Sequence, residues 1–143
     1  MFRSMKKHKR KFFVHDKFEE SMGINMELRE IYEQINGDYD SVFSRLHNDE
    51  RIKKYLLKFI NNKLDTLIRN ALDAGDYETA FREAHNLKGI CANLNIDKLG
   101  KSASELTEAL RGRNPEGDIS SLVEAMQADY DMTIRALNVL TEE

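Results

Sequence analysis

The stretch AFREAHNLKGICANLN, residues 80–95, belongs to the most regular helical repeat in this sequence. Followed from Tyr77 onward, small or apolar residues recur at successive spacings of 3, 4, 3, 4 and 3 residues. They are Tyr77, Ala80, Ala84, Leu87, Cys91 and Leu94. This spacing puts all of them on one stripe of a helix, as in a helix packed within a bundle. Because Asp76 is a favourable N-cap, we predict a helix that starts there and reaches Leu94.

Helical periodicity extends over most of the remaining sequence, whereas strand signals are nearly absent. The other predicted helices cover residues 26–35, 39–47, 50–60, 63–74, 98–110 and 119–140. Asn61 and Asn62 form a weak break, and residues 112–117 are the one obvious loop. Short connections favour antiparallel neighbours. The sequence therefore predicts an all-α protein, an antiparallel four-helix bundle with one or two additional short N-terminal helices.

Composition favours a soluble helical protein of one domain. Charged residues make up 33% and hydrophobic residues 41% of the 143 residues. The apolar runs are short and interrupted by charges, so we expect no membrane insertion. Cys91 is the only cysteine, which excludes an internal disulfide and fits a cytoplasmic location.

The charge of the chain is unevenly distributed. Residues 1–14 contain six Lys or Arg and no acid, although the net charge of the whole chain is −3. We therefore divide the chain into a flexible basic N-terminal tail, residues 1–25, and a folded domain, residues 26–143. A basic tail can contact nucleic acid or anionic lipid. A nucleic-acid-binding protein that uses residues 3–11 remains an alternative, which the acidic remainder of the chain disfavours.

Two common kinds of site find no support. The GKS of residues 100–102 resembles the end of a phosphate-binding loop, but Asn95 occupies the position of its first glycine and no strand precedes it. The four histidines show no i,i+4 pair, so we expect no metal site and no bound cofactor. The many carboxylates are typical of a solvated helix surface.

His85 differs from the other polar residues of its helix because of its position. It follows Ala84 of the apolar stripe by one residue, about 100° around the helix, so its ring should lie at the edge of the buried stripe. Lys88 and Gly89 follow at i+3 and i+4, on the same face. A neutral imidazole is a nucleophile near neutral pH. If His85 accepts a phosphoryl group, Lys88 can offset its charge and Gly89 leaves room for the donor. The alternative is a histidine without function on an amphipathic helix.

At AHNLKG, residues 84–89, the sequence resembles the histidine-containing phosphotransfer (HPt) domains of phosphorelays. The site helix of that family reads approximately A-H-x-L-K-G, followed by small residues and N-L-G. Ala92, Asn93 and Leu94 match the second part. Residues 73–85 are similar to the family's turn into this helix, and residues 103–112 to its next helix. Over residues 26–140 the chain is most similar to small stand-alone HPt proteins of Gram-positive anaerobic bacteria.

The resemblance implies a four-helix bundle with an exposed phosphoacceptor histidine. His85 would accept the phosphoryl group, Lys88 would be its charge partner, Gly89 would provide clearance, and Arg111 would contact the phosphoryl group. Such a protein is a phosphocarrier and no enzyme in its own right, since the receiver domain of its partner and that domain's Mg²⁺ supply the transfer chemistry. The implied partners are response-regulator receiver domains and a hybrid histidine kinase, with the chain acting as a monomer.

Two positions depart from the family pattern. Asn95 replaces the usual glycine after N-L, which predicts a slightly altered helix end. Thr107 replaces a larger polar or acidic residue that faces the histidine in many members, which puts a supporting hydrogen bond in doubt. Two alternatives within the family stay open: a degenerate docking module that carries no phosphoryl group, and a domain excised from a hybrid histidine kinase. Around His85 we expect a receiver-docking surface that includes Phe81 or Arg82, Ala92 and the exposed face of residues 98–111.

Overall fold

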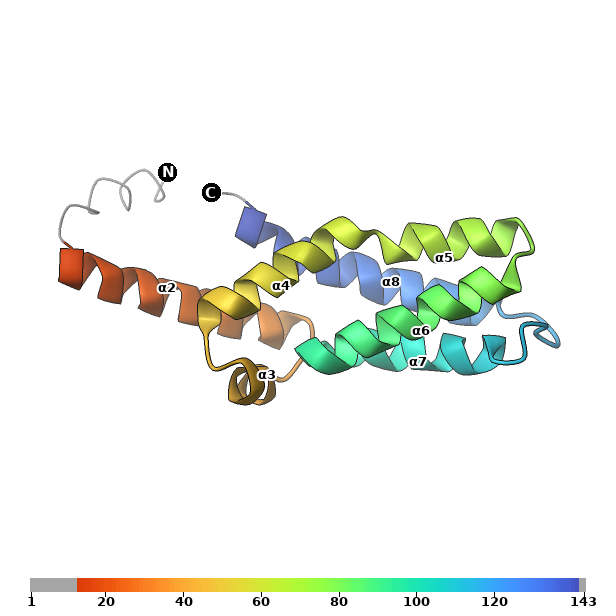
Figure 1. Ribbon diagram of the computed structural model, residues 1–143, viewed down its shortest axis with the longest axis horizontal. Helices are drawn as coiled ribbons and strands as arrows, with labels where there is room; N and C mark the ends of the chain where they lie inside the picture. The colour runs from red at the N-terminus through yellow and green to blue at the C-terminus, as the bar shows by residue number, and fades with distance from the viewer. Residues whose placement is uncertain (1–12, 142–143) are drawn as a thin grey trace.

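A computed structural model describes residues 13–141 of the protein (Figure 1). In chain order its helices are α2 (Phe13–Gln34), α3 (Tyr39–Leu46), α4 (Asp49–Asn62), α5 (Leu64–Asp73), α6 (Tyr77–Leu94), α7 (Asp97–Leu110) and α8 (Ser120–Leu137), followed by a 3₁₀ turn, η1 (Asn138–Thr141). The described part of the chain contains no strand, which confirms the all-α prediction. No helix within residues 13–141 is both long enough and apolar enough to cross a membrane.

A four-helix bundle forms the body of the molecule. The pair α4–α5 supplies one of its four members, and α6, α7 and α8 supply the others (Figure 1). Helix α6 packs mainly against α7 and α5, and α7 packs against α8. The predicted stripe of α6 is buried from Ala80 to Leu94, with only Tyr77 partly exposed at its start. The 3-4 spacing therefore located the buried side of this helix correctly.

The break between α4 and α5 lies at Lys63, one residue after the predicted break. Lys63 has a φ of 51°, in the left-handed region, and so ends α4 and precedes α5. The side-chain oxygen of Asn62 accepts hydrogen bonds from the Leu64 N–H at 3.2 Å and from the Tyr130 hydroxyl at 3.1 Å. The bond from Tyr130 ties the break to α8, and the bond from Leu64 caps the start of α5.

Helix α2 corrects the prediction for the N-terminal region. The helix begins at Phe13 rather than at Met26, and it is not short, so the proposed boundary at residue 25 falls inside it. Among the residues of α2 whose side chains are described, Ile24 is partly buried against the core and Leu28 is the first that is fully buried. Backbone hydrogen bonding continues the helix beyond that point. Residues 1–12 of the proposed tail lie outside the described residues.

Helices α2 and α3 close the C-terminal end of α6. The Tyr32 hydroxyl donates a hydrogen bond to the Leu94 carbonyl at 2.7 Å. The guanidinium of Arg45 donates to the carbonyl oxygens of Ala92 and Asn93 and to the side-chain oxygen of Asn95. These carbonyls belong to the last turn of α6. The carbonyl groups of a last turn find no N–H partner within their own helix. Helices α2 and α3 thus cap the C-terminal end of α6.

The turn after α2 requires a glycine because it approaches α6 closely. A Cβ added to Gly37 would lie 2.5 Å from the carbonyl oxygen of Asn95. The next residue, Asp38, donates its N–H to the same oxygen at 3.0 Å. Its carboxylate accepts from the Ser41 N–H at 3.1 Å and so caps α3. The turn therefore brings α3 against the end of α6.

Candidate functional site

His85 lies in the middle of α6 with its side chain exposed to solvent. Its sequence neighbour Ala84 and the following stripe residue Leu87 are fully buried. The imidazole makes no hydrogen bond within the described part of the chain. The helix therefore presents an exposed ring at the edge of its buried stripe, the position expected from the sequence.

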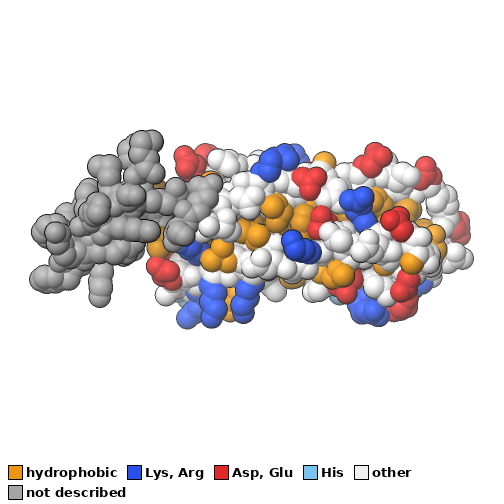
Figure 2. All heavy atoms as spheres, turned by 90° about the horizontal axis from the view of Figure 1, so that it is seen from above, with side chains coloured by type: hydrophobic (Ala, Val, Ile, Leu, Met, Phe, Trp, Pro, Cys, Tyr) orange, Lys and Arg blue, Asp and Glu red, His pale blue; other side chains and the backbone are white. Residues whose placement is uncertain are grey.

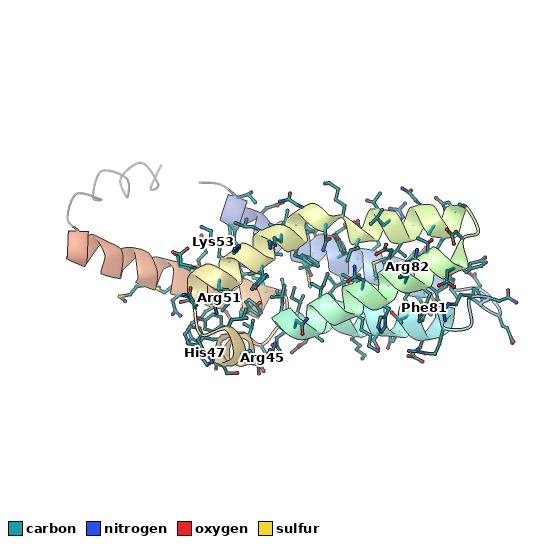
Figure 3. All side chains as sticks on the ribbon, in the orientation of Figure 1. Arg45, His47, Arg51, Lys53, Phe81 and Arg82 are labelled. Carbon is teal, nitrogen blue, oxygen red and sulfur yellow. The ribbon has the colours of Figure 1, made fainter. Side chains whose placement is uncertain are left out.

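The ring of Phe81, one helical turn before His85, stacks on the imidazole. The two ring centroids are 6.0 Å apart, and the planes meet at 14°. Offset stacking at this separation is a favourable arrangement for two aromatic rings. Among the described residues this ring contact is the specific side-chain interaction of His85. Figure 3 shows Phe81 and Arg82 on α6, well away from Arg45, Arg51 and Lys53 at the α3–α4 end.

Lys88 and Gly89 follow His85 on the next turn of α6. Lys88 is partly buried on the side of α7, where its positive charge contributes to lowering the pKa of Glu108. Gly89 is exposed, and a Cβ added to it would meet no atom within 4 Å. Nothing inside the protein therefore requires a glycine at this position of the helix. The open space next to His85 belongs to the molecular surface.

Arg111 lies directly after α7, on the same side of α6 as Lys88. Its Nη2 donates to Glu108 Oε2 at 2.5 Å and its Nε to Glu108 Oε1 at 3.2 Å. The hydrogen bonds from Arg111, assisted by the charge of Lys88, hold the pKa of Glu108 below its usual range. The Arg111 guanidinium is 5.5 Å from the ring centroid of Phe81. Arg111 therefore lies near Phe81, and both Arg111 and Lys88 act on Glu108, a carboxylate that the sequence analysis did not single out.

Arg113 is a further cation at this place that sequence reasoning missed. Its guanidinium carbon lies 3.9 Å from the ring centroid of Phe81. It also donates from Nε to Glu78 Oε1 at 3.1 Å, across 35 residues of sequence. No periodicity indicates such a contact, because Arg113 lies in the loop after α7. Only the return of that loop over the N-terminal half of α6 reveals it.

The two departures from the family pattern have clear structural outcomes. Asn95 ends α6 with a φ of 55° and takes the left-handed conformation that glycine usually provides. Thr107 is fully buried, and its hydroxyl donates to the Ala103 carbonyl within α7 at 2.7 Å. That hydroxyl is therefore committed to its own helix.

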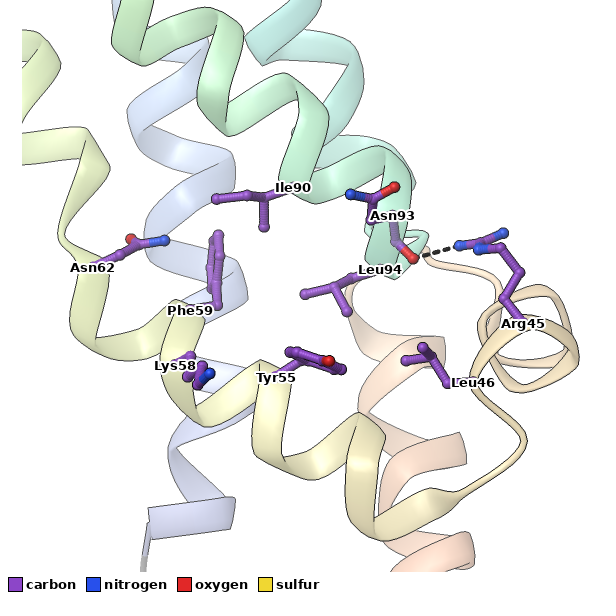
Figure 4. Close-up of a pocket in the computed structure, with 9 residues that line it drawn as sticks. All are labelled: Arg45, Leu46, Tyr55, Lys58, Phe59, Asn62, Ile90, Asn93 and Leu94. Atoms are coloured by element: carbon purple, nitrogen blue, oxygen red, sulfur yellow. Dashed lines mark hydrogen bonds between the residues drawn. The ribbon is translucent and has the colours of Figure 1, made fainter.

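A cleft opens between α4 and the second half of α6, with the end of α3 at one side (Figure 4). Its volume is about 530 Å³, and its walls are mostly apolar. It is lined by Arg45, Leu46, Tyr55, Lys58, Phe59, Asn62, Ile90, Asn93 and Leu94. Apolar side chains also gather along the middle of the face seen in Figure 2. The cleft is lined by residues of α3, α4 and α6 and by none of the residues expected from the sequence to dock a receiver.

Metal ligands do not gather anywhere in the described part of the chain. Residues 13–141 contain no group of three or more His, Cys, Asp or Glu side chains that could hold a metal ion. His85 presents an exposed imidazole, and a neutral imidazole is a nucleophile near neutral pH. It can accept an electrophilic group that carries negative charge.

Comparison with known proteins gives one match. The family model described as "Hpt domain" matches residues 55–137, more than half of the chain, from α4 to the end of α8. No curated protein and no solved structure matches the chain. Helices α2 and α3 lie outside the matched residues, whereas His85 and its neighbours lie within them.

Proposed function

The chain belongs to the Hpt domain family, and from that premise we propose that His85 accepts a phosphoryl group from the aspartate of one receiver domain and passes it to another. Hpt domains are the histidine phosphotransfer modules of two-component phosphorelays. To this general role of the family the proposal adds the phosphoacceptor residue, the partner domains and the order of transfer. It rests mainly on one observation: an exposed imidazole without a hydrogen-bond partner in the described chain lies beside open surface at Gly89.

In the proposed step a nitrogen of His85 attacks the phosphorus of an aspartyl phosphate. A P–N bond forms while the bond to the carboxylate oxygen breaks, and the carboxylate leaves. The receiver holds the divalent metal that this chemistry uses, so this chain contributes the nucleophile and its surroundings. Lys88 and Arg111 place positive charge near the group that His85 receives, which favours a negatively charged product. The reverse step returns the phosphoryl group to a second receiver.

Receiver docking is expected to extend well beyond His85. A specific interface buries about 800 Å² on each partner, which corresponds to a patch with a radius of about 16 Å. Asn93 follows His85 by eight residues, or about 12 Å along the helix axis. A receiver centred on His85 would therefore also cover the cleft lined by Tyr55, Phe59 and Ile90. We include this cleft in the docking surface, together with Ala92, which is exposed.

The relay that we propose begins at a hybrid histidine kinase and runs in the cytoplasm, with the chain acting as a monomer. Incubation with phosphorylated receivers tests the transfer. A phosphohistidine is labile in acid and stable in base, because protonation of its nitrogen makes the imidazole a good leaving group. We expect such a label on the wild type and none on His85→Gln. Because His85 is exposed, this variant should retain its stability to within about 0.5 kcal/mol.

Two results would contradict the proposal. Undiminished labelling of His85→Gln would move the phosphoacceptor elsewhere. If every receiver bound the wild-type protein and none labelled it, the chain would be the degenerate docking module instead.

A further inference from the structure

Phe81 connects the exposed His85 to the loop that follows α7. The ring is only partly buried and packs against the edge of the core. Its neighbours on the solvent side are the imidazole of His85, with centroids 6.0 Å apart, and the guanidinium of Arg113, 3.9 Å from the ring centroid. A cation over an aromatic face is attracted by the ring electrons. Phe81 is therefore held from one side by a cation while it contacts the candidate nucleophile.

Two side-chain hydrogen bonds hold Arg113 in place. Its backbone has a φ of 57°, a conformation that residues other than glycine rarely adopt. Its Nη1 donates to the Arg111 carbonyl at 2.7 Å, and its Nε donates to Glu78 at 3.1 Å. Glu78 also forms an ion pair with Arg82 at 3.8 Å. The guanidinium is therefore used in holding the loop against α6 and in covering Phe81.

We propose that Phe81, held by Arg113, is a positioning residue that fixes the ring of His85 for phosphoryl transfer. The inference rests on the proposed function of His85. An exposed side chain without a hydrogen bond turns freely about its side-chain bonds, and each reactive encounter then requires that the ring be ordered. Because Arg113 holds the ring of Phe81, stacking on that ring orders the side chain of His85 before the donor binds and so lowers the entropic cost of the reaction. The reacting nitrogen is thus presented in one direction before the donor arrives.

Lys88 and Arg111 act differently from Phe81. The two cations contribute positive charge, whereas Phe81 orients the imidazole. Orientation should matter for any phosphoryl donor, including one too small to dock on the protein surface. Phosphoramidate is such a donor. A new P–N bond to His85 forms as the donor's own P–N bond breaks, ammonia leaves, and the displaced ring proton passes to water. This reaction separates positioning from receiver docking.

The test compares Phe81→Leu with Phe81→Tyr in the full chain, without a receiver. Phe81→Leu keeps an apolar side chain but loses the ring. We expect labelling of His85 by phosphoramidate to slow by about three- to tenfold, the range that corresponds to an aromatic pair of ordinary strength. Phe81→Tyr keeps the ring and should restore most of the rate. Arg113→Gln, a change at a loop residue, should slow labelling in the same direction by a smaller factor.

A spectroscopic readout distinguishes positioning from a loss of stability. The ring current of Phe81 should shift the ring-proton resonances of His85 upfield, and Phe81→Leu should remove this shift at an unchanged melting temperature. Labelling of Phe81→Leu at the wild-type rate, or His85 resonances that do not change in this variant, would overturn the inference. Absence of label on the wild type after incubation with phosphorylated receivers would instead overturn the proposed function, and the resonances would still decide whether the two rings stack.

Discussion

Arg111 and Glu108 form a two-point ion pair at the end of α7, with N···O distances of 2.5 and 3.2 Å. Glu108 thus already binds Arg111, the cation that we expect to contact the phosphoryl group. It also keeps a carboxylate near the charge of Lys88. A phosphoryl group on His85 would therefore have to share both cations with Glu108.

Glu108→Gln should raise the fraction of protein phosphorylated at equilibrium with a receiver by about two- to fivefold. The change removes a negative charge and releases Arg111, and exposed ion pairs of this kind contribute up to about 1 kcal/mol. The measurement is the equilibrium distribution of label between receiver and chain. Glu124→Gln, an exposed change on α8, is the control and should have no effect. A lower phosphorylated fraction in Glu108→Gln would mean that the carboxylate positions Arg111 productively.

Gly89→Ala should stabilise the fold and yet slow transfer from a receiver. An added Cβ meets nothing within 4 Å, and alanine is favoured over glycine within a helix by roughly 0.5–1 kcal/mol. The same methyl group would occupy the surface that an incoming receiver approaches. The melting temperature should therefore rise while the rate of transfer from the receiver falls. Gly23→Ala in α2 is a matched control, since its added Cβ also meets nothing and it lies outside the residues of the site.

Lys88→Ala should slow transfer by about ten- to a hundredfold without abolishing it. A charged hydrogen bond contributes about 1.5–3 kcal/mol, whereas the nucleophile and the receiver's metal remain in place. The rate of label transfer from a phosphorylated receiver gives the answer. Arg135→Ala on α8 removes a charge of the same sign and should leave the rate unchanged. Equal rates for Lys88→Ala and the wild type would exclude Lys88 as a charge partner.

Cys91 should be inert to thiol reagents in the folded protein. It is 1% exposed, and burial raises its pKa to about 12, so almost no thiolate forms at pH 8. We expect modification to require denaturant and to follow unfolding. Rapid modification of the native protein would show that the contact between α6 and α7 opens readily.

Acid should weaken the caps of α3 and α6. The pKa of Asp76 is lowered by hydrogen bonds from the hydroxyl and the N–H of Thr79, and the pKa of Asp38 is lowered in the same way by Ser41. The unfolded chain therefore binds these protons more readily, so the contribution of both caps is present above about pH 4 and is lost as the pH falls through the folded-state pKa values. In thermal unfolding between pH 3 and 6, the variant Asp38→Asn/Asp76→Asn should lose less stability than the wild type, because asparagine caps without titrating.

Much of the fold could be predicted from the sequence because it depends on local repeats. The stripe of α6 and the capping residues Asp38 and Asp76 are signals within a few residues of each other. The start of α2 was not predicted in this way, because its first turns extend past the other helices (Figure 1) and the sequence there shows no clear 3-4 apolar repeat. The last predicted helix also ends differently, in a 3₁₀ turn from Asn138 onward.

In the candidate site, too, local relationships could be predicted from the sequence and long-range contacts could not. His85, Lys88 and Gly89 share one helix, so their spacing alone placed them together. The contacts of Phe81 with Arg113, and of Arg113 with Glu78, join α6 to a loop that lies 32 and 35 residues later in the sequence. Such contacts depend on how a loop returns over a helix, which periodicity does not encode. The ion pair of Glu108 is local, and an i,i+3 search of α7 and its end could have found it.

The cap that Tyr32 and Arg45 place on the end of α6 bears on how this module can be cut or transplanted. The region recognisable as the family domain starts at residue 55, after both of these residues. A fragment trimmed to residues 55–137 would keep His85 but lose the groups that close the last turn of its helix. We expect that turn to fray in the fragment, which would reshape one wall of the neighbouring cleft. For domain exchange between signalling proteins, the transferable unit therefore begins no later than the hydrogen-bonded part of α2.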